Sequence, residues 1–147
     1  MTGWWIGWMI VPEDLLRSIE CLAQNLFISA PSLSQVAGVA AFECREELEQ
    51  NIKRYAANRE LLLRELPKSG FCNLASADGG FYIYADVGTL TNDSSKFCAR
   101  MLAETGIAAT PGTDFDPTRG HKYLRFSFSG ETSLMTEAAK RLNEWQK

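Results

Sequence analysis

The sequence predicts an α/β protein in two parts: a strand with helices, followed by a small, strand-rich α+β unit that a last helix closes. Residues 4–11 are apolar without alternation, which is typical of a strand that is buried on both faces. A helical apolar pattern over residues 45–66 predicts a long linking helix. Strand patterns dominate the second half, where residues 123–129 alternate between apolar and polar side chains. We therefore expect a division into residues 1–44 and residues 45–147.

Composition narrows the class of protein. A net charge of −3 over 147 residues leaves no basic field for nucleic acid or for an anionic membrane. The four cysteines lack C-x-x-C spacing and there is a single histidine, so we expect no metal site and reduced thiols in a cytoplasmic protein. The apolar start is shorter than the roughly 20 residues that a membrane span needs, and it lacks the cationic start of a signal peptide.

The first part is expected to contain two helices after the strand. Pro12 suits the first position of a helix over residues 12–27, whose apolar residues form one stripe. A second helix over residues 31–42 is rich in small apolar residues, which predicts that it is buried. A strand that is apolar on both faces needs cover on both sides, so we expect further residues upstream of Met1.

The second part is expected to alternate between strands and helices. Pro67 and Gly70 end the linking helix. Asp93 or Thr91 should cap a helix that ends at Gly106. The remaining predicted elements are strands at residues 71–74, 81–87, 107–110 and 123–129, and a last helix at residues 132–146 that buries Leu134, Ala138, Leu142 and Trp145.

Four stretches occur in an order and at separations that resemble one family. They are residues 1–8 (MTGWWIGW), residues 78–82 (DGGFY), residues 109–112 (ATPG) with Phe115 after them, and residues 124–128 (LRFSF); the Asn58-Arg59 pair also fits. Together they resemble the class I and II aminotransferases of the aspartate-aminotransferase fold type. The resemblance covers essentially the whole chain and implies the C-terminal portion of a fold-type I pyridoxal-phosphate (PLP) enzyme. It also implies that the α+β unit has a short, mainly antiparallel sheet packed with helices.

Under this resemblance, residues 1–44 are a remnant of the large PLP-binding domain and residues 45–147 are the small domain. Arg125 matches the family arginine that grips the α-carboxylate of the substrate. A guanidinium suits that role, because two parallel N–H donors fix the orientation of a carboxylate. Taken without the resemblance, the polar face of a strand favours a solvated arginine, or one that is paired with Asp114 or Asp116.

The resemblance also predicts what the chain lacks. The Schiff-base lysine of the family would precede Met1, so no catalytic residue is assigned. Trp5 occupies the position of the family arginine that holds the PLP phosphate, and an indole offers one N–H donor and no charge. The chain is therefore not expected to bind PLP by itself. The three tryptophans at positions 4, 5 and 8 are more typical of a core than of a cofactor platform.

The first hypothesis for function is a C-terminal fragment of an amino-acid aminotransferase that is inactive without the rest of the enzyme. The parent reaction transfers an amino group from an amino acid to a 2-oxo acid, and the family implies a homodimer. The alternatives are a non-catalytic association module and the inactive product of a truncated gene. The sequence does not choose among acidic, aromatic and alanine-type substrates.

Overall fold

The structure, a computed structural model, describes residues 3–145. The chain divides into two compact units, Met1–Glu49 (the first unit) and Gln50–Lys147 (the second unit). The family stretch at residues 1–8 includes Met1 and Thr2, and the predicted last helix includes Gln146. These three residues lie outside the described residues. Within the described part, no helix has the length and apolar character that crossing a membrane requires.

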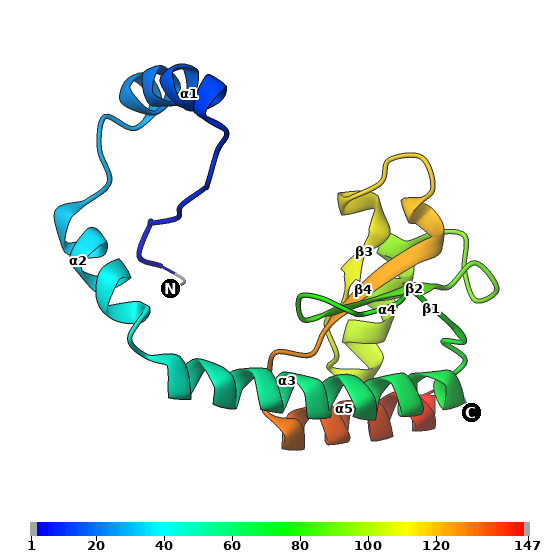
Figure 1. Cartoon of the computed structure of the whole chain (residues 1–147). Helices are drawn as coiled ribbons and strands as arrows, with labels where there is room; N and C mark the ends of the chain where they lie inside the picture. The colour runs from blue at the N-terminus through cyan, green and yellow to red at the C-terminus, as the bar shows by residue number, and fades with distance from the viewer. Residues whose placement is uncertain (1–2, 146–147) are drawn as a thin grey trace. The chain divides into compact units, whose positions relative to one another are not determined.

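The second unit is built on a small antiparallel sheet, as predicted (Figure 1). Its four strands have the order β1-β2-β4-β3. The central pair is β2 (Tyr82–Asp86) and β4 (Tyr123–Ser127), flanked by the two-residue strands β1 (Asn73–Leu74) and β3 (Thr110–Pro111). The edge strands are shorter than predicted, because apolar character alone does not give a residue a hydrogen-bonding partner: Phe71 is buried but lies outside β1.

The register of the central strands separates two faces. Ile83 lies opposite Phe126, and both are buried. Tyr84 lies opposite Arg125 on the other face. The alternation predicted for residues 123–129 is therefore confirmed over β4, because successive side chains of a strand point to opposite faces.

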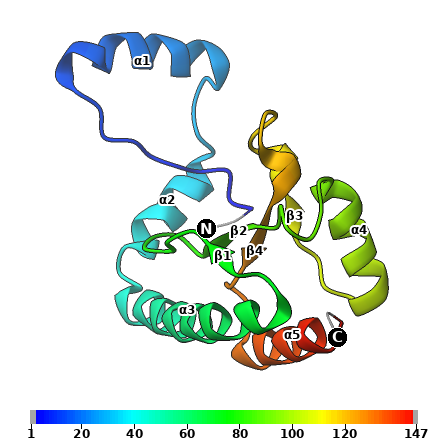
Figure 2. The same cartoon turned by 90° about the vertical axis from the view of Figure 1, so that its right-hand side faces the viewer.

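Helices supply the other half of the core in the second unit. These helices are α3 (Arg45–Glu65), α4 (Ser94–Thr105) and α5 (Thr132–Trp145). The helix α3 begins in the first unit. In the second unit, α3 and α5 run side by side (Figures 1 and 2). The core they share with the sheet includes Leu62, Leu66, Phe71, Ile83, Ala85, Phe97, Met101, Leu124, Phe126, Phe128 and Leu142. Leu142 is buried as predicted, but the prediction for Leu134 is wrong: it lies in the first turn of α5, beyond the cover of the core, and is 63% exposed.

Two predicted helix ends are confirmed. Asp93 caps α4, with its carboxylate accepting the backbone N–H of Lys96 at 3.1 Å. That backbone N–H, together with the Lys96 side chain, lowers the pKa of Asp93. Gly106 ends α4 with φ 73°, a left-handed conformation that glycine adopts without a steric penalty.

The first unit contains the two predicted helices, α1 (Glu13–Leu26) and α2 (Ser32–Ala41). The predicted strand at residues 4–11 is wrong: the segment belongs to no helix and has no strand pairing. A strand exists only where a second strand accepts and donates its backbone hydrogen bonds, and within the described residues none pairs with this segment. Trp8 instead packs its ring against Phe42, with centroids 5.0 Å apart.

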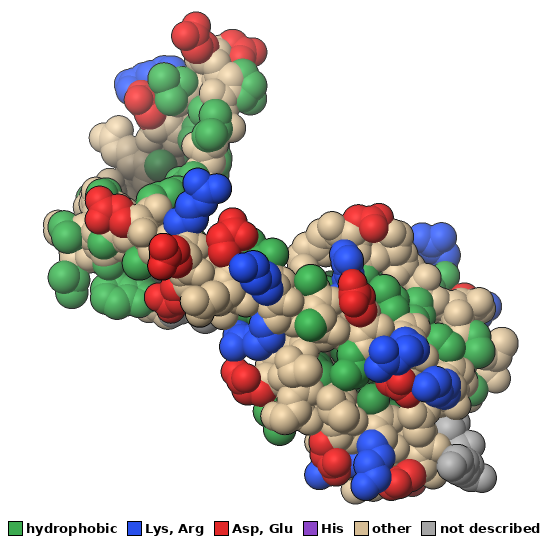
Figure 3. Space-filling view, turned by 60° about the horizontal axis from the view of Figure 1, so that its bottom comes forward, with side chains coloured by type: hydrophobic (Ala, Val, Ile, Leu, Met, Phe, Trp, Pro, Cys, Tyr) green, Lys and Arg blue, Asp and Glu red, His purple; other side chains and the backbone are tan. Residues whose placement is uncertain are grey.

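The predicted burial of the first unit is also wrong. Val36 and Val39 of α2 are exposed, α1 buries no residue, and Trp5 is 89% exposed rather than part of a core. Apolar side chains gather on the surface of this unit (Figure 3). Small apolar residues predict burial only where another element covers them, and no described element covers these.

Candidate functional site

Arg125 lies in the middle of the sheet of the second unit. Its backbone is paired with Tyr84 of β2 on one side and with Thr110 of β3 on the other. The side chain belongs to the face opposite the core and is half-buried. A residue fixed between two strands is held more rigidly than one on a loop, which suits a group that must orient a ligand.

Two aromatic rings lie against the Arg125 guanidinium. Its central carbon is 4.0 Å from the centroid of the Tyr82 ring and 4.3 Å from that of Phe115. Both distances are well within the range of cation–π attraction. No described residue forms an ion pair or a hydrogen bond with this guanidinium, so its N–H donors remain available to a ligand.

The aspartates that the sequence offered as partners for Arg125 are not paired with it. Asp116 instead forms an ion pair with Arg119 at 3.3 Å. It also accepts the backbone N–H groups of Arg119 and Thr118 at 3.0 and 2.9 Å, and these bonds lower the pKa of its carboxyl. Asp114 is exposed in the 3₁₀ turn η2 (Gly112–Asp114) and forms no ion pair among the described residues.

A tight contact between two glycines fixes the loop that carries Phe115. A Cβ atom at Gly112 would lie 2.6 Å from the backbone oxygen of Gly120 and 2.7 Å from the Tyr84 hydroxyl. The Tyr84 ring is stacked on Tyr123 with 2° between the planes, and burial is the main cause that raises the pKa of Tyr84. Only glycine fits position 112, which explains the last residue of the ATPG stretch.

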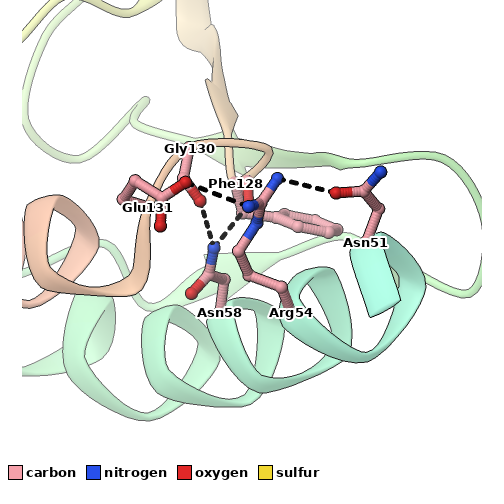
Figure 4. A network of polar contacts seen from close by, with 6 residues as sticks. All are labelled: Asn51, Arg54, Asn58, Phe128, Gly130 and Glu131. Carbon is pink, nitrogen blue, oxygen red and sulfur yellow. Dashed lines mark hydrogen bonds and ion pairs between the residues drawn. The ribbon is translucent and has the colours of Figure 1, made fainter. Parts of the chain in front are cut away.

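The sequence prediction missed the structural role of Asn58. It had no predicted role beyond its fit to the family, but its side chain is fully buried. Its Nδ2 donates to the backbone oxygens of Phe128 at 2.9 Å and Gly130 at 2.8 Å, where β4 leads into α5 (Figure 4). The available signal was spacing: Asn58 stands four residues before Leu62, on the apolar face of α3.

The same turn is held by a second contact from α3. Arg54 forms an ion pair with Glu131 at 2.9 Å and donates to Asn51 at 3.0 Å (Figure 4). Arg59, the neighbour of Asn58, donates to the backbone oxygen of Ala77 at 3.2 Å. The Asn58-Arg59 pair of the sequence therefore connects α3 to two loops of the second unit.

Position 5 does not fit a phosphate group. Trp5 is almost fully exposed and has a left-handed backbone with φ 52°. Residues 3–11 contain no lysine or arginine, so Trp5 offers one indole N–H and its segment brings no cation. Among the described residues, no cluster of three or more histidine, cysteine or acidic side chains has an arrangement suited to a metal ion.

The chain is similar to known proteins over nearly its whole length. The family model described as aminotransferase class I and II matches residues 1–142. The valine–pyruvate aminotransferase of Mycobacterium tuberculosis is 47% identical over 99% of this chain, which covers 38% of that protein.

Two solved structures are similar in three dimensions. A protein of Silicibacter pomeroyi has a TM-score of 0.94 and 52% identity, with 99% of this chain covering 40% of that one. An aminotransferase of Mycobacterium tuberculosis has a TM-score of 0.92 and 47% identity over 99% of this chain and 38% of that one. The chain thus spans about two-fifths of the length of these relatives. The chain belongs to the class I and II aminotransferase family.

Proposed function

We propose that the second unit supplies the carboxylate-binding part of an amino-acid aminotransferase, with Arg125 as the group that binds the α-carboxylate of the amino acid and of the 2-oxo acid. The observation that carries this proposal is the Arg125 guanidinium itself. It is fixed in the middle of the sheet, and no described residue neutralises it. Its planar fork can donate two parallel N–H bonds to a carboxylate, which sets the orientation of the substrate as well as its affinity.

The cofactor of the family is PLP, and the described residues of this chain do not fit its phosphate. The position that matches the phosphate-binding arginine holds Trp5, and the surrounding segment brings no other cation. We therefore propose that this chain by itself neither binds PLP nor transfers amino groups. Purified chain mixed with PLP, valine and pyruvate should form no 2-oxo acid product from valine, and turnover that survives stringent purification would contradict this part of the proposal.

Binding of a carboxylate can be tested directly by NMR. Pyruvate and valine are suitable probes, because a relative that is 47% identical is a valine–pyruvate aminotransferase. Titration should move the side-chain Nε–Hε signal of Arg125. The response should disappear in Arg125→Gln and persist in Arg119→Gln, which removes an equal charge from an exposed site of the same unit. An equal response of the backbone signals of Tyr84 and Thr110 in both variants would refute the role of Arg125.

A second candidate function is association with another polypeptide. It is favoured by the exposed apolar side chains of the first unit, such as Ile10 at 98% and Ile28 at 86%. Large exposed apolar surfaces are typical of interaction sites. Size-exclusion chromatography with light scattering tests this candidate and the homodimer that the family suggests, since a monomer at all concentrations would contradict self-association.

A further inference from the structure

We propose that Tyr82 and Phe115 form an aromatic clamp that positions the Arg125 guanidinium, leaving only the N–H edge of its plane for a ligand. The two rings are positioning residues in this proposal, since they act through Arg125. The choice of a carboxylate as the ligand rests on the proposed function, but the clamp follows from the geometry of the three side chains.

The distances place both rings against the guanidinium. The centroids of Tyr82 and Phe115 lie 4.0 Å and 4.3 Å from the same carbon atom of Arg125. These are contact distances, because carbon atoms pack at about 3.5–4.0 Å. Two rings cannot both stack on one face at such a distance without overlapping. In the clamp, one ring covers each face of the guanidinium, and a polar ligand approaches from the edge, where the N–H bonds point.

Each ring is held by a separate structural feature. Tyr82 lies opposite Ser127 in the β2–β4 register, which makes it the diagonal neighbour of Arg125, within reach of a long side chain. Phe115 follows η2, and its backbone N–H donates to Gly112 at 3.0 Å. Because Gly112 is locked against Gly120, the turn presents Phe115 at a fixed place.

The clamp explains two features that the core does not explain. Tyr82 and Phe115 remain 37% and 51% exposed, so packing in the core is not what holds these large rings in place. Arg125 has a long, flexible side chain, and a side chain that is immobilised before the ligand arrives loses less entropy on binding. The rings thus raise affinity without accepting the N–H bonds that point to the ligand.

The test uses the whole chain and four variants. Phe115→Leu and Tyr82→Ala each remove one ring, while Tyr82→Phe keeps the ring and removes only the hydroxyl. The first readout is the Arg125 Nε–Hε signal in ¹H–¹⁵N NMR, because a proton above an aromatic ring resonates upfield. Ring removal should move this signal downfield and speed its hydrogen exchange, and Tyr82→Phe should leave both unchanged. Arg125→Lys identifies the signal by its loss.

The second readout is affinity for pyruvate in the same samples. Each ring-loss variant should bind roughly two- to fivefold more weakly, the range that corresponds to one exposed cation–π contact. Backbone signals of Ile83 and Phe126 report whether the sheet remains folded. An unchanged Arg125 signal in both ring-loss variants, with the sheet intact, overturns the clamp. If the signal moves but the unmodified chain binds no pyruvate, the clamp is supported and the proposed carboxylate role fails.

Discussion

Replacing Asn58 by alanine should destabilise the second unit by about 2 kcal/mol, because it leaves two backbone oxygens without their donor. The Asn58 side chain is fully buried and donates to Phe128 and Gly130 at 2.9 and 2.8 Å. These two bonds connect α3 to the point where β4 leads into α5. The loss should therefore affect the global unfolding of the unit rather than local fraying.

The magnitude follows from opposing contributions. An acceptor left unsatisfied costs about 1–3 kcal/mol, so we take roughly 2.5 kcal/mol for the buried Phe128 oxygen and roughly 1 kcal/mol for the part-buried Gly130 oxygen. Against this, alanine has a helix propensity that is better by roughly 0.5 kcal/mol. The substitution also removes Asn58 Oδ1, a buried oxygen that has no partner in the described residues, which recovers about 1 kcal/mol. The net of these contributions is the loss stated above.

Urea unfolding followed by circular dichroism measures this loss. With a slope of about 1–2 kcal/mol per molar urea for a small unit, the midpoint should fall by roughly 1–2 M. The control is Asn51→Ala in the same helix, which gains the same propensity but removes only one hydrogen bond, from Arg54 at a partly buried site. The control should shift stability by less than about 0.5 kcal/mol. Equal midpoints for the two variants would refute the argument from burial.

Two further outcomes follow from the second unit. Gly120→Ala would place its Cβ against the backbone of Gly112, which cannot move aside, and should cost more than about 2 kcal/mol in urea unfolding. Gly79→Ala meets nothing within 4 Å and should be neutral, so similar losses would contradict the steric reasoning. Burial, with a smaller contribution from Asp114, raises the pKa of the Cys98 thiol to about 11. The unfolded thiol loses its proton near pH 8.5, so the folded state should lose up to about 1.4 kcal/mol per pH unit from there up to pH 11. Cys98→Ala should lack this loss between pH 8 and 10.5, and identical pH profiles would exclude the thiol as its source.

The sequence predicted best those features that local chemistry determines. The alternation of residues 123–129 requires only that one face of a strand meets a core, and the second unit provides that core from its own helices. The Asp93 cap and the Gly106 terminus are equally local, since each satisfies or ends its own helix. The family resemblance predicted the small antiparallel sheet, because the family motifs lie in or beside the strands of that sheet.

The errors have a shared physical origin. The pattern of residues 4–11 shows that both faces of a strand would be apolar. A partner strand and a covering layer must come from other segments, and the described chain provides neither. The small apolar residues of α2 were misinterpreted for the same reason. Asn58 illustrates the opposite case, because a polar residue on an apolar helix face is buried only if it finds acceptors, and those acceptors lie 70 and 72 residues further along the chain.

Carboxylate binding and phosphate binding place different demands on this chain. The Arg125 site is built entirely within the second unit, from the β2–β4 register and the glycine contact that fixes Phe115. Each of these features is stabilised by packing that does not involve position 5. A phosphate requires a cation or several convergent donors, but Trp5 has one indole N–H and residues 3–11 contain no lysine or arginine. We therefore expect the tryptophan at position 5 to weaken cofactor binding without altering the geometry through which Arg125 would hold a carboxylate.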